Sequence, residues 1–146
     1  MTLVMKFEVD RIKELLKEKG LRCTDARVAI YSHFLETNKP LSIQNFKTNK
    51  KFSDFDESSL YRNFSKLDEA GLIRLIPSSG DFQYYEATLL THEHHHHHIT
   101  CTKCAKITCL DSCGVDSQLK KMAKEVGYKI EGHKLELYGL CQECSA

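Results

Sequence analysis

A histidine-rich segment that leads directly into a cysteine pair constrains this chain more than any other feature. Five consecutive histidines at 94–98 are followed, after an Ile-Thr step, by the C-x-x-C pair Cys101 and Cys104. A second C-x-x-C pair, Cys141 and Cys144, lies near the C-terminus. Imidazole and thiolate are the side chains that zinc and its neighbours prefer as ligands. We therefore expect metal to be central to this protein, as a support for structure, as a reaction centre or as a switch.

The length and composition are typical of a globular protein with one ordinary domain or two small ones. The chain has 146 residues, of which 41% are hydrophobic and 28% charged, and it has no apolar run long enough to span a membrane. The N-terminal stretch lacks the apolar core of a signal peptide, so we expect a cytoplasmic location. The net charge of +1 argues against a broadly basic nucleic-acid-binding protein but allows a local DNA-binding patch. Without a secretion signal, two C-x-x-C pairs hold metal more often than disulfides.

The N-terminal half predicts four helices followed by a β-hairpin, the element order of a winged helix-turn-helix. Apolar residues at helical spacing mark the first helix, which Gly20 ends, and the fourth helix, which Gly71 ends. The predicted capping residues are Thr24 or Asp25 for the second helix, Ser42 for a short third helix and Asp56 for the fourth. The hairpin consists of strands at 72–76 and 82–86 that are joined by a turn at 77–80.

The C-terminal half predicts a smaller unit of mixed helix and strand. It begins with the histidine strand and a strand at 107–110, and it ends with strands between 128 and 140. The helix between them stops at Gly127, and its apolar stripe consists of Val115, Leu119, Met122 and Val126. We therefore predict an α+β fold with two domains, at 1–86 and 93–146, that are joined by a hinge at 87–92.

The fourth predicted helix has the surface chemistry of a DNA-reading helix. With Leu60, Phe64 and Leu67 facing inward, small hydroxyls, a tyrosine and an arginine face outward near the helix N-terminus. Such groups can bind phosphates, and a tyrosine can contact a thymine methyl group. The candidate DNA-binding residues are Arg22, Arg27, Ser58, Ser59, Tyr61 and Arg62, with Ser65 also facing outward and Lys66 as a further backbone contact. The alternative is an ordinary amphipathic helix whose outer face is only solvated.

The two C-x-x-C pairs together predict a structural zinc site. Cys101, Cys104, Cys141 and Cys144 supply four thiolates, which is the closed tetrahedral ligand set of structural zinc. Such a site would tie the C-terminal tail to the strand that follows the histidines. Each pair could instead be a redox motif, but two pairs in one chain favour zinc.

The histidine run divides into two faces if it forms a strand. Successive side chains of a strand point to opposite sides. His96 and His98 therefore point to one side, and His95 and His97 to the other. One short strand can thus supply ligands to two separate metal sites.

Six motifs occur in order along nearly the whole chain. They are G-L-R-C-T-D-A-R at 20–27, S-S-L-Y-R-N-F-S-K-L-D-E-A-G-L-I at 58–73, Y-Y-E at 84–86, H-H-H-H-I-T-C-T-K-C at 95–104, G-H-K-L-E-L-Y-G-L-C at 132–141 and C-Q-E-C at 141–144. In this order they resemble the ferric uptake regulator family of bacterial metal-sensing repressors. The resemblance implies an N-terminal winged helix that binds DNA and a small C-terminal α/β domain that dimerises. It further implies a homodimer that binds a palindromic operator in double-stranded DNA when metal is bound and blocks transcription. Such a protein is not an enzyme and uses no membrane or small-molecule substrate.

The resemblance also assigns ligands to two further metal sites. It implies a sensing site between the domains that contains Glu86, His96 and His98. A second site inside the dimerisation domain would contain His95, His97, Asp116 and His133, although Asp116 also suits the start of a helix. The implied cofactors are a structural Zn²⁺ and a second divalent ion, Zn²⁺ or Fe²⁺, with a regulatory role.

The chain departs from the family pattern at the sensing site. The family usually adds a histidine from the loop between the second and third helices, where this chain has Pro40 and no histidine. The remaining ligand could come from His33, His92, Glu93, His94 or Cys109. His33 is otherwise expected on a helix surface. We expect Cys23, Cys109 and Cys113 to be packing or idle thiols rather than redox or auxiliary metal groups.

Other functions remain open beside a metal-responsive repressor. Within the family, iron, zinc or peroxide could be the signal, and a nitrogen-rich ligand set favours zinc or iron. A zinc buffer or storage protein that does not bind DNA is a second alternative. A zinc hydrolase or deaminase is disfavoured, because the chain contains no H-E-x-x-H or H-x-E…P-C-x-x-C pattern.

Overall fold

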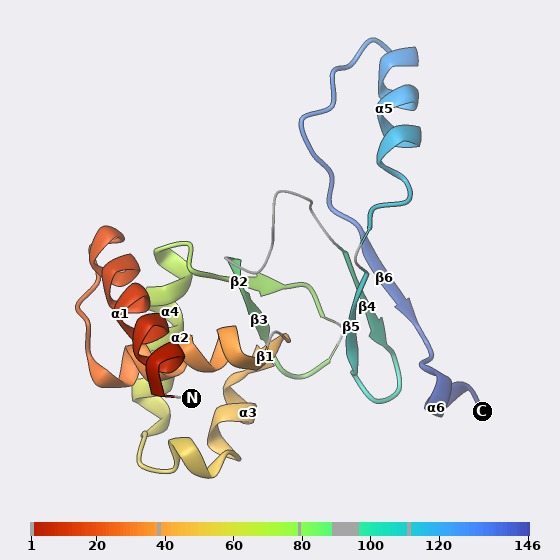
Figure 1. Ribbon diagram of the computed structural model, residues 1–146. Coiled ribbons are helices and arrows are strands. Elements are labelled where there is room, and N and C mark those ends of the chain that lie inside the picture. Colours follow the sequence, from red (N-terminus) through yellow and green to blue (C-terminus); the bar gives the residue numbers. More distant parts are fainter. Residues whose placement is uncertain (1, 38, 79, 89–96, 111) are drawn as a thin grey trace. The chain divides into compact units, whose positions relative to one another are not determined.

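A computed structural model describes residues 2–37, 39–78, 80–88, 97–110 and 112–146, with side chains from Val9 onward (Figure 1). The chain divides into two compact units, one formed by Met1–Pro77 with Asp81–Leu90 and the other by Ser78–Gly80 with Thr91–Ala146. Most of the predicted hinge at 87–92 lies outside the described residues, so its bounds stay a prediction. Within the described residues, no helix is both long and apolar enough to cross a membrane.

The first helix ends, and the second begins, at the predicted signals. Helix α1 (Thr2–Glu18) is followed by Gly20, which adopts a φ of +72° and donates its amide to the Lys17 carbonyl at 2.9 Å. Only glycine adopts this left-handed conformation at little cost, so the residue terminates the helix. Helix α2 (Asp25–Thr37) begins after Thr24, whose Oγ1 accepts the Arg27 amide at 3.2 Å. The predicted stop and cap are confirmed.

The next two helices are also defined by local capping. Helix α3 (Ile43–Lys47) carries a capping box in which Ser42 and Asn45 hydrogen-bond each other's backbone amides. A short 3₁₀ helix, η1 (Lys50–Phe52), follows and was not predicted. Helix α4 (Glu57–Glu69) begins after Asp56, whose carboxylate accepts the Ser59 amide at 2.5 Å. The predicted caps of both helices are confirmed.

An aromatic core fixes α4 in the N-terminal unit. The predicted inward stripe of Leu60, Phe64 and Leu67 is buried. The Phe64 ring lies 5.4 Å from that of Phe34 on α2 and 5.2 Å from that of Phe46 on α3, measured between centroids. Aromatic pairs at such separations add to the free energy of burial. The helix is therefore held by its inner face while its outer face stays free for another role.

The wing of the N-terminal unit is a three-stranded antiparallel sheet in the order β1-β3-β2. Strands β2 (Ile73–Ile76) and β3 (Tyr84–Ala87) form the predicted hairpin, with Ile73 opposite Ala87. Strand β1 (Leu41–Ser42) adds to the other edge of β3 and was not predicted. Two residues are too few for an alternating pattern to be recognised in the sequence.

The sheet of the C-terminal unit has the order β5-β4-β6. Strand β4 (His97–Cys101) pairs antiparallel with β5 (Ile107–Leu110) and parallel with β6 (Glu136–Gly139). The strand at 107–110 is confirmed. The prediction of strand from 128 is wrong for 128–135, since pairing with β4 begins only at Glu136.

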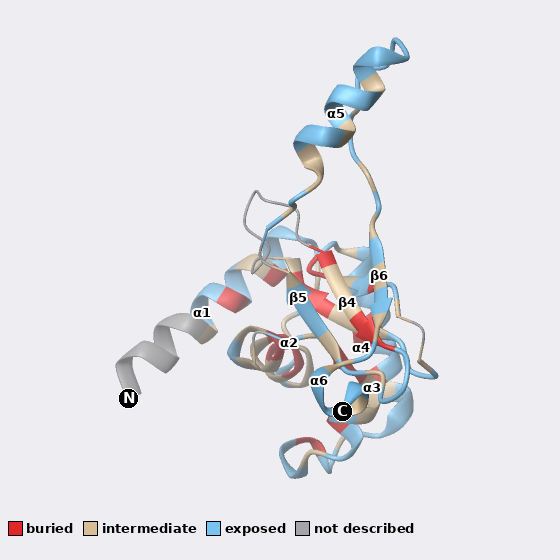
Figure 2. Ribbon diagram, turned by 90° about the vertical axis from the view of Figure 1, so that its right-hand side faces the viewer, coloured by how far each residue is buried: buried red, intermediate tan, exposed pale blue. Residues whose placement is uncertain are grey.

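Helix α5 (Asp116–Glu125) connects β5 to β6 and ends before Gly127, which has a φ of +83°. None of its residues is buried, and Met122 is 61% exposed (Figure 2). The sequence pattern identified the helix and its apolar stripe correctly, but among the described residues that stripe packs against no core. A short helix, α6 (Gln142–Ser145), follows β6 and was not predicted.

The Asp56 cap provides a test of how α4 is held. Replacing Asp56 with Ala leaves the Ser59 amide without its side-chain acceptor. We expect the free energy of unfolding to fall by about 1 kcal/mol. Urea unfolding followed by far-ultraviolet circular dichroism would measure the change, with Asp54→Ala as the control. Equal stability of the two variants would show that the cap does not stabilise α4.

Candidate metal centres and DNA-binding surface

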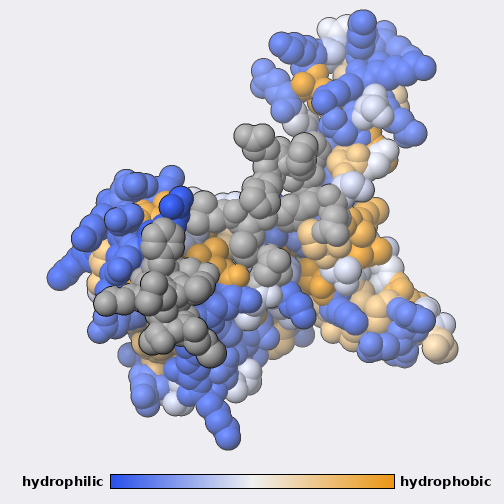
Figure 3. Space-filling view, in the orientation of Figure 1, coloured by the Kyte–Doolittle hydropathy of each residue, from blue (hydrophilic) through white to orange (hydrophobic). Residues whose placement is uncertain are grey.

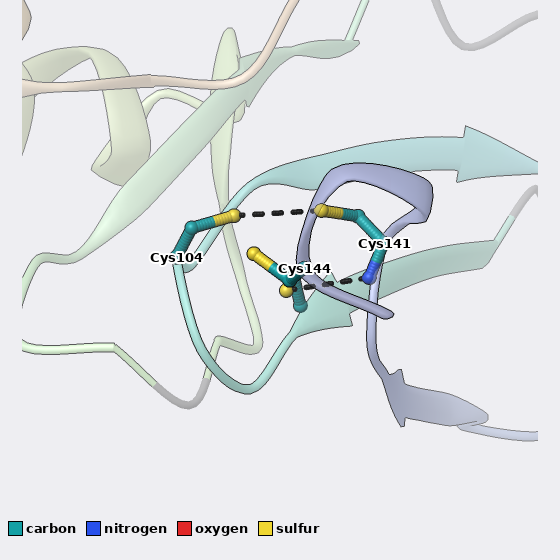
Figure 4. A group of neighbouring side chains, drawn as sticks. Cys104, Cys141 and Cys144 are labelled. Carbon is teal, nitrogen blue, oxygen red and sulfur yellow. Dashed lines mark hydrogen bonds between the residues drawn. The ribbon is translucent and has the colours of Figure 1, made fainter. Parts of the chain in front are cut away.

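The two C-x-x-C pairs come together at one end of the C-terminal sheet. Cys101 ends β4, Cys104 lies in the following turn, Cys141 immediately precedes α6 and Cys144 lies in α6. Their four sulfur atoms all lie within 4.8 Å of one another. Figure 4 shows the side chains of Cys104, Cys141 and Cys144 directed toward one another, with 3.8 Å between the sulfurs of Cys104 and Cys141. The structure thus brings together the four cysteines that the sequence selected.

This geometry suits a metal ion rather than a disulfide. Zinc–sulfur bonds of about 2.3 Å in a tetrahedron place neighbouring sulfurs about 3.8 Å apart. A disulfide requires a separation of about 2.05 Å, and all four cysteines are free thiols. The parallel pairing of β4 with β6 explains why the two C-x-x-C pairs lie together. It places Cys101 opposite Gly139, two residues before Cys141.

The pKa values of two thiols in the cluster, Cys101 and Cys144, are shifted in opposite directions. Hydrogen bonds from the backbone amides of Cys104 and Cys141 lower the pKa of Cys101 to about 6. The neighbouring sulfur of Cys141 is the main cause that raises the pKa of Cys144 to about 12. Several adjacent thiolates repel one another, so one forms readily at the expense of another. A bound divalent cation offsets that repulsion and allows all four to ionise.

A second cluster forms at the other end of β4. It consists of His97 at the start of the strand, Cys113 in the segment after β5 and His133 shortly before β6. The Nε2 atoms of His97 and His133 are 3.0 Å apart, and the Cys113 Sγ lies 3.4 Å from the His133 Nε2. The side chain of His97 is buried and the other two are partly buried. Three potential metal ligands therefore converge on one point.

The structure brings together part of the set that the resemblance implied for this second site. Asp116 faces the opposite nitrogen of His133, with 3.9 Å between its Oδ1 and the Nδ1, and its Oδ2 lies 2.6 Å from the Lys120 Nζ. His95 lies outside the described residues. Cys113 was not predicted as a ligand of this site, since no short spacing in the sequence links it to either histidine. Only the fold could reveal it.

The residues expected at the sensing site are described only in part. Glu86, on β3 of the N-terminal unit, is 8% exposed and forms a 2.6 Å ion pair with Arg74 on β2. His98, on β4 of the C-terminal unit, is partly buried and lies opposite Cys109 on β5. His96 lies outside the described residues, as do His92, Glu93 and His94. The Glu86, His96 and His98 ligand set therefore stays a prediction.

Two other residues considered in the sequence have defined surroundings. His33 is partly buried rather than on an open helix surface, because its ring packs edge-on against Phe46 and Phe52 at 5.2 and 5.1 Å. Partial burial, together with the nearby Lys51, lowers the pKa of His33. The Cys23 thiol donates to the Lys13 carbonyl at 3.2 Å, and its side chain packs against the core, in line with the expected packing role.

The outer face of α4 presents the expected polar residues. Tyr61 is 54% exposed, and Ser58, Arg62, Ser65 and Lys66 are also exposed, whereas Ser59 is partly buried. The guanidinium of Arg27 is held from within the unit. Its Nε donates to the Asn63 Oδ1 at 3.2 Å and its Nη1 to the Arg22 carbonyl at 2.8 Å. Arg27 therefore ties the start of α2 to α4, while Arg22 itself is exposed.

Comparisons of the sequence identify relatives along nearly the whole chain. The model of the "Ferric uptake regulator family" matches residues 18–138. The chain is 30% identical over 140 residues to the peroxide operon regulator of Bacillus subtilis (strain 168), covering 94% of each protein. It is 32% identical over 137 residues to the ferric uptake regulation protein of Staphylococcus epidermidis, covering 92% of this chain and 94% of that protein.

Solved structures of ferric uptake regulators share the fold of this chain. The Helicobacter pylori ferric uptake regulator shares the fold, with a TM-score of 0.79 and 22% identity over 97% of this chain and 93% of that one. The iron-bound ferric uptake regulator of Francisella tularensis gives a TM-score of 0.75 at 25% identity over 87% of this chain and 96% of that one. The predicted α+β class is confirmed. The chain therefore belongs to the ferric uptake regulator family, whose members are metal-responsive, DNA-binding transcription regulators rather than enzymes.

Proposed function

We propose that this protein represses genes of metal uptake or homeostasis as a cytoplasmic homodimer that binds palindromic operators when metal is bound. The main support is the exposed polar face of α4, in a chain whose other unit assembles two clusters of metal ligands. The first unit offers a DNA-reading surface, and the second offers sites that respond to metal. Family regulators combine the same two activities.

Operator binding would use the outer face of α4. The N-terminal residues of a recognition helix contact base edges in the major groove, and hydroxyl and guanidinium groups bind phosphates. Ser58, Ser59, Tyr61 and Arg62 lie in the first half of α4 and suit these roles. Arg22 would contact the backbone. Arg27 would act mainly by orienting α4 through Asn63, because its guanidinium already has partners within the unit.

Metal would control operator affinity through Glu86, His96 and His98. Glu86 belongs to the DNA-binding unit and His98 to the other unit, so an ion held by both would couple the two. Glu86 is ion-paired with Arg74 across the wing sheet, and metal binding would redirect that carboxylate. Because binding free energies are reciprocal, operator DNA would also tighten metal binding.

The other two sites would stabilise the dimerisation unit. Structural Zn²⁺ would occupy the four-cysteine cluster, whose closed ligand set leaves no open position for chemistry. A second ion, Zn²⁺ or Fe²⁺, would bind in the cluster that includes His97 and His133, where the family resemblance adds His95 and Asp116. The C-terminal unit exposes large side chains that would be covered in the dimer, among them Met122, Val126, Tyr128, Tyr138 and Leu140. Figure 3 shows hydrophobic surface among polar residues on this unit.

A peroxide-responsive regulator is the second candidate. It is favoured by the similarity to a Bacillus subtilis protein that is named a peroxide operon regulator. Against it, the two clusters found among the described residues contain histidine and cysteine and no carboxylate. Ligand sets of this kind favour zinc over harder ions. We therefore place a direct response to metal first.

The proposed control by metal can be tested with the double variant His96→Ala and His98→Ala. Operator DNA would be obtained by selecting random-sequence duplexes with the metal-loaded wild-type protein. In gel shifts, added metal should tighten wild-type binding by about 5- to 150-fold, the range typical of coupled sites, and should leave the double variant unchanged. If metal-stripped wild-type protein and the double variant both bind as tightly as the metal-loaded protein, the proposed switch is wrong.

The role of α4 separates a regulator from a zinc buffer. Tyr61→Ala should weaken binding to the selected operator by roughly 1–3 kcal/mol, the range for one good base contact, without changing the zinc content. Tyr61→Phe, which retains the ring, should keep most of the affinity if the ring contacts a thymine methyl group. An unchanged operator affinity of Tyr61→Ala would favour metal storage.

A further inference from the structure

Two neighbouring ligand atoms approach one ring nitrogen in the cluster of His97, Cys113 and His133. The His133 Nε2 lies 3.0 Å from the His97 Nε2 and 3.4 Å from the Cys113 Sγ. A neutral imidazole nitrogen has either one proton to donate or one lone pair to accept with. A single ring nitrogen therefore cannot make a strong hydrogen bond to each neighbour. A cation at the centre would accept a lone pair from all three atoms.

The distances match a shared metal ion. Tetrahedral zinc with Zn–N bonds of about 2.05 Å and Zn–S bonds of about 2.3 Å places two nitrogens about 3.3 Å apart, and a nitrogen and a sulfur about 3.6 Å apart. The observed separations of 3.0 and 3.4 Å are slightly shorter than both values. Binding an ion would need only a small outward movement of the side chains.

The nearby carboxylate of Asp116 favours one tautomer of His133. The carboxylate of Asp116 faces its Nδ1 at 3.9 Å, and the Lys120 ammonium holds the other carboxylate oxygen at 2.6 Å. A carboxylate on this side favours the tautomer with the proton on Nδ1, which leaves the Nε2 lone pair directed into the cluster. Metal-binding histidines are commonly oriented in this way by an outer carboxylate.

We propose that Cys113 is a thiolate ligand of a metal ion that is shared with His97 and His133, and that this thiolate makes the centre selective for zinc over iron and manganese. The proposal deepens the proposed function, on which it rests, since it concerns the second metal site of the dimerisation unit. It replaces the expectation of an idle thiol at position 113. It also assigns Asp116 to orienting His133 rather than to direct contact with the ion.

Selectivity follows from the donor types. Thiolate is a soft ligand and imidazole a borderline one, and together they favour Zn²⁺ over the harder Mn²⁺ and Fe²⁺. The thiolate also gives the centre a negative charge that two neutral histidines would lack. A carboxylate at position 113 would retain that charge but change the donor to oxygen. Comparing a thiolate with a carboxylate at position 113 therefore separates the effect of a soft donor atom from the effect of negative charge.

Cobalt spectroscopy tests the thiolate bond directly. Protein that retains zinc in the four-cysteine cluster would be titrated with Co²⁺, because a thiolate bound to cobalt gives a near-ultraviolet charge-transfer band. Cys113→Ser should lose the band that Co²⁺ induces in the wild-type protein, and zinc affinity should fall by at least about tenfold. Cys23→Ser, which removes a thiol from the other unit, should behave as wild type.

Replacing the sulfur donor at position 113 with an oxygen donor tests the selectivity for zinc over manganese. Cys113→Asp should bind zinc more weakly than wild type while its affinity for Mn²⁺ is maintained or improved, so that the ratio of the two affinities falls. If a variant fails to fold, the wild-type protein still provides a test. Bound zinc should slow alkylation of Cys113 by iodoacetamide, as read by peptide mass spectrometry.

Several results would overturn the proposal. In the cobalt titration, they are a charge-transfer band that survives Cys113→Ser or one that disappears only in Cys109→Ser. In the exchange experiment, it is an unchanged ratio of zinc to manganese affinity in Cys113→Asp. In the alkylation experiment, it is modification of Cys113 at the same rate with and without zinc. All of these experiments measure metal binding without DNA. Their failure would therefore be distinguishable from failure of the proposed operator switch, which is measured on DNA.

Discussion

The parallel pairing of β4 with β6 is the constraint on which the C-terminal unit depends. It places Cys101 opposite Gly139 at one end of β4 and His98 opposite Glu136 near the other. Cysteines from distant parts of the chain therefore meet beyond one end, and His97 meets His133 beyond the other. Parallel neighbours cannot be joined by a tight turn, so the chain must make a longer crossover, which α5 supplies. A metal ion at each end would hold the two strands together where the short sheet is weakest.

In the N-terminal unit, packing holds helix α4 in a fixed position. Aromatic rings from α2 and α3 pack around Phe64 of α4, and the Arg27–Asn63 hydrogen bond adds a polar link from α2 to α4. With its inner face and its cap fixed, α4 can expose Tyr61 and Arg62 without losing its position. With a net charge of +1, the proposed DNA affinity would come from this local surface and not from a general positive charge.

Local chemistry explains what could be predicted from the sequence. Caps at Ser42 and Asp56, and glycine stops at Gly20 and Gly71, depend on neighbours within a few residues, and all were predicted correctly. The four-cysteine cluster was also predictable, because C-x-x-C spacing reflects local ligand geometry.

Long-range structure explains what could not be predicted. Strand β1 exists only because β3 offers a free edge, and β6 starts at Glu136 because the register with β4 sets that point. The stripe of α5 has no core partner in the part of the chain that the structure describes, so the general rule that an apolar stripe is buried does not hold for it. Cys113 joins His97 and His133 only through the crossover, and nothing in its sequence spacing indicates a ligand.

We infer that metal ions organise both ends of β4. Anomalous X-ray scattering from crystals of protein purified without added metal tests this claim most directly, since it gives the element and its ligands together. We expect a zinc peak equidistant from the sulfurs of Cys101, Cys104, Cys141 and Cys144, and a second metal peak between His97, Cys113 and His133. Disulfides joining the four cysteines, or the absence of any anomalous peak at both ends of β4, would contradict it.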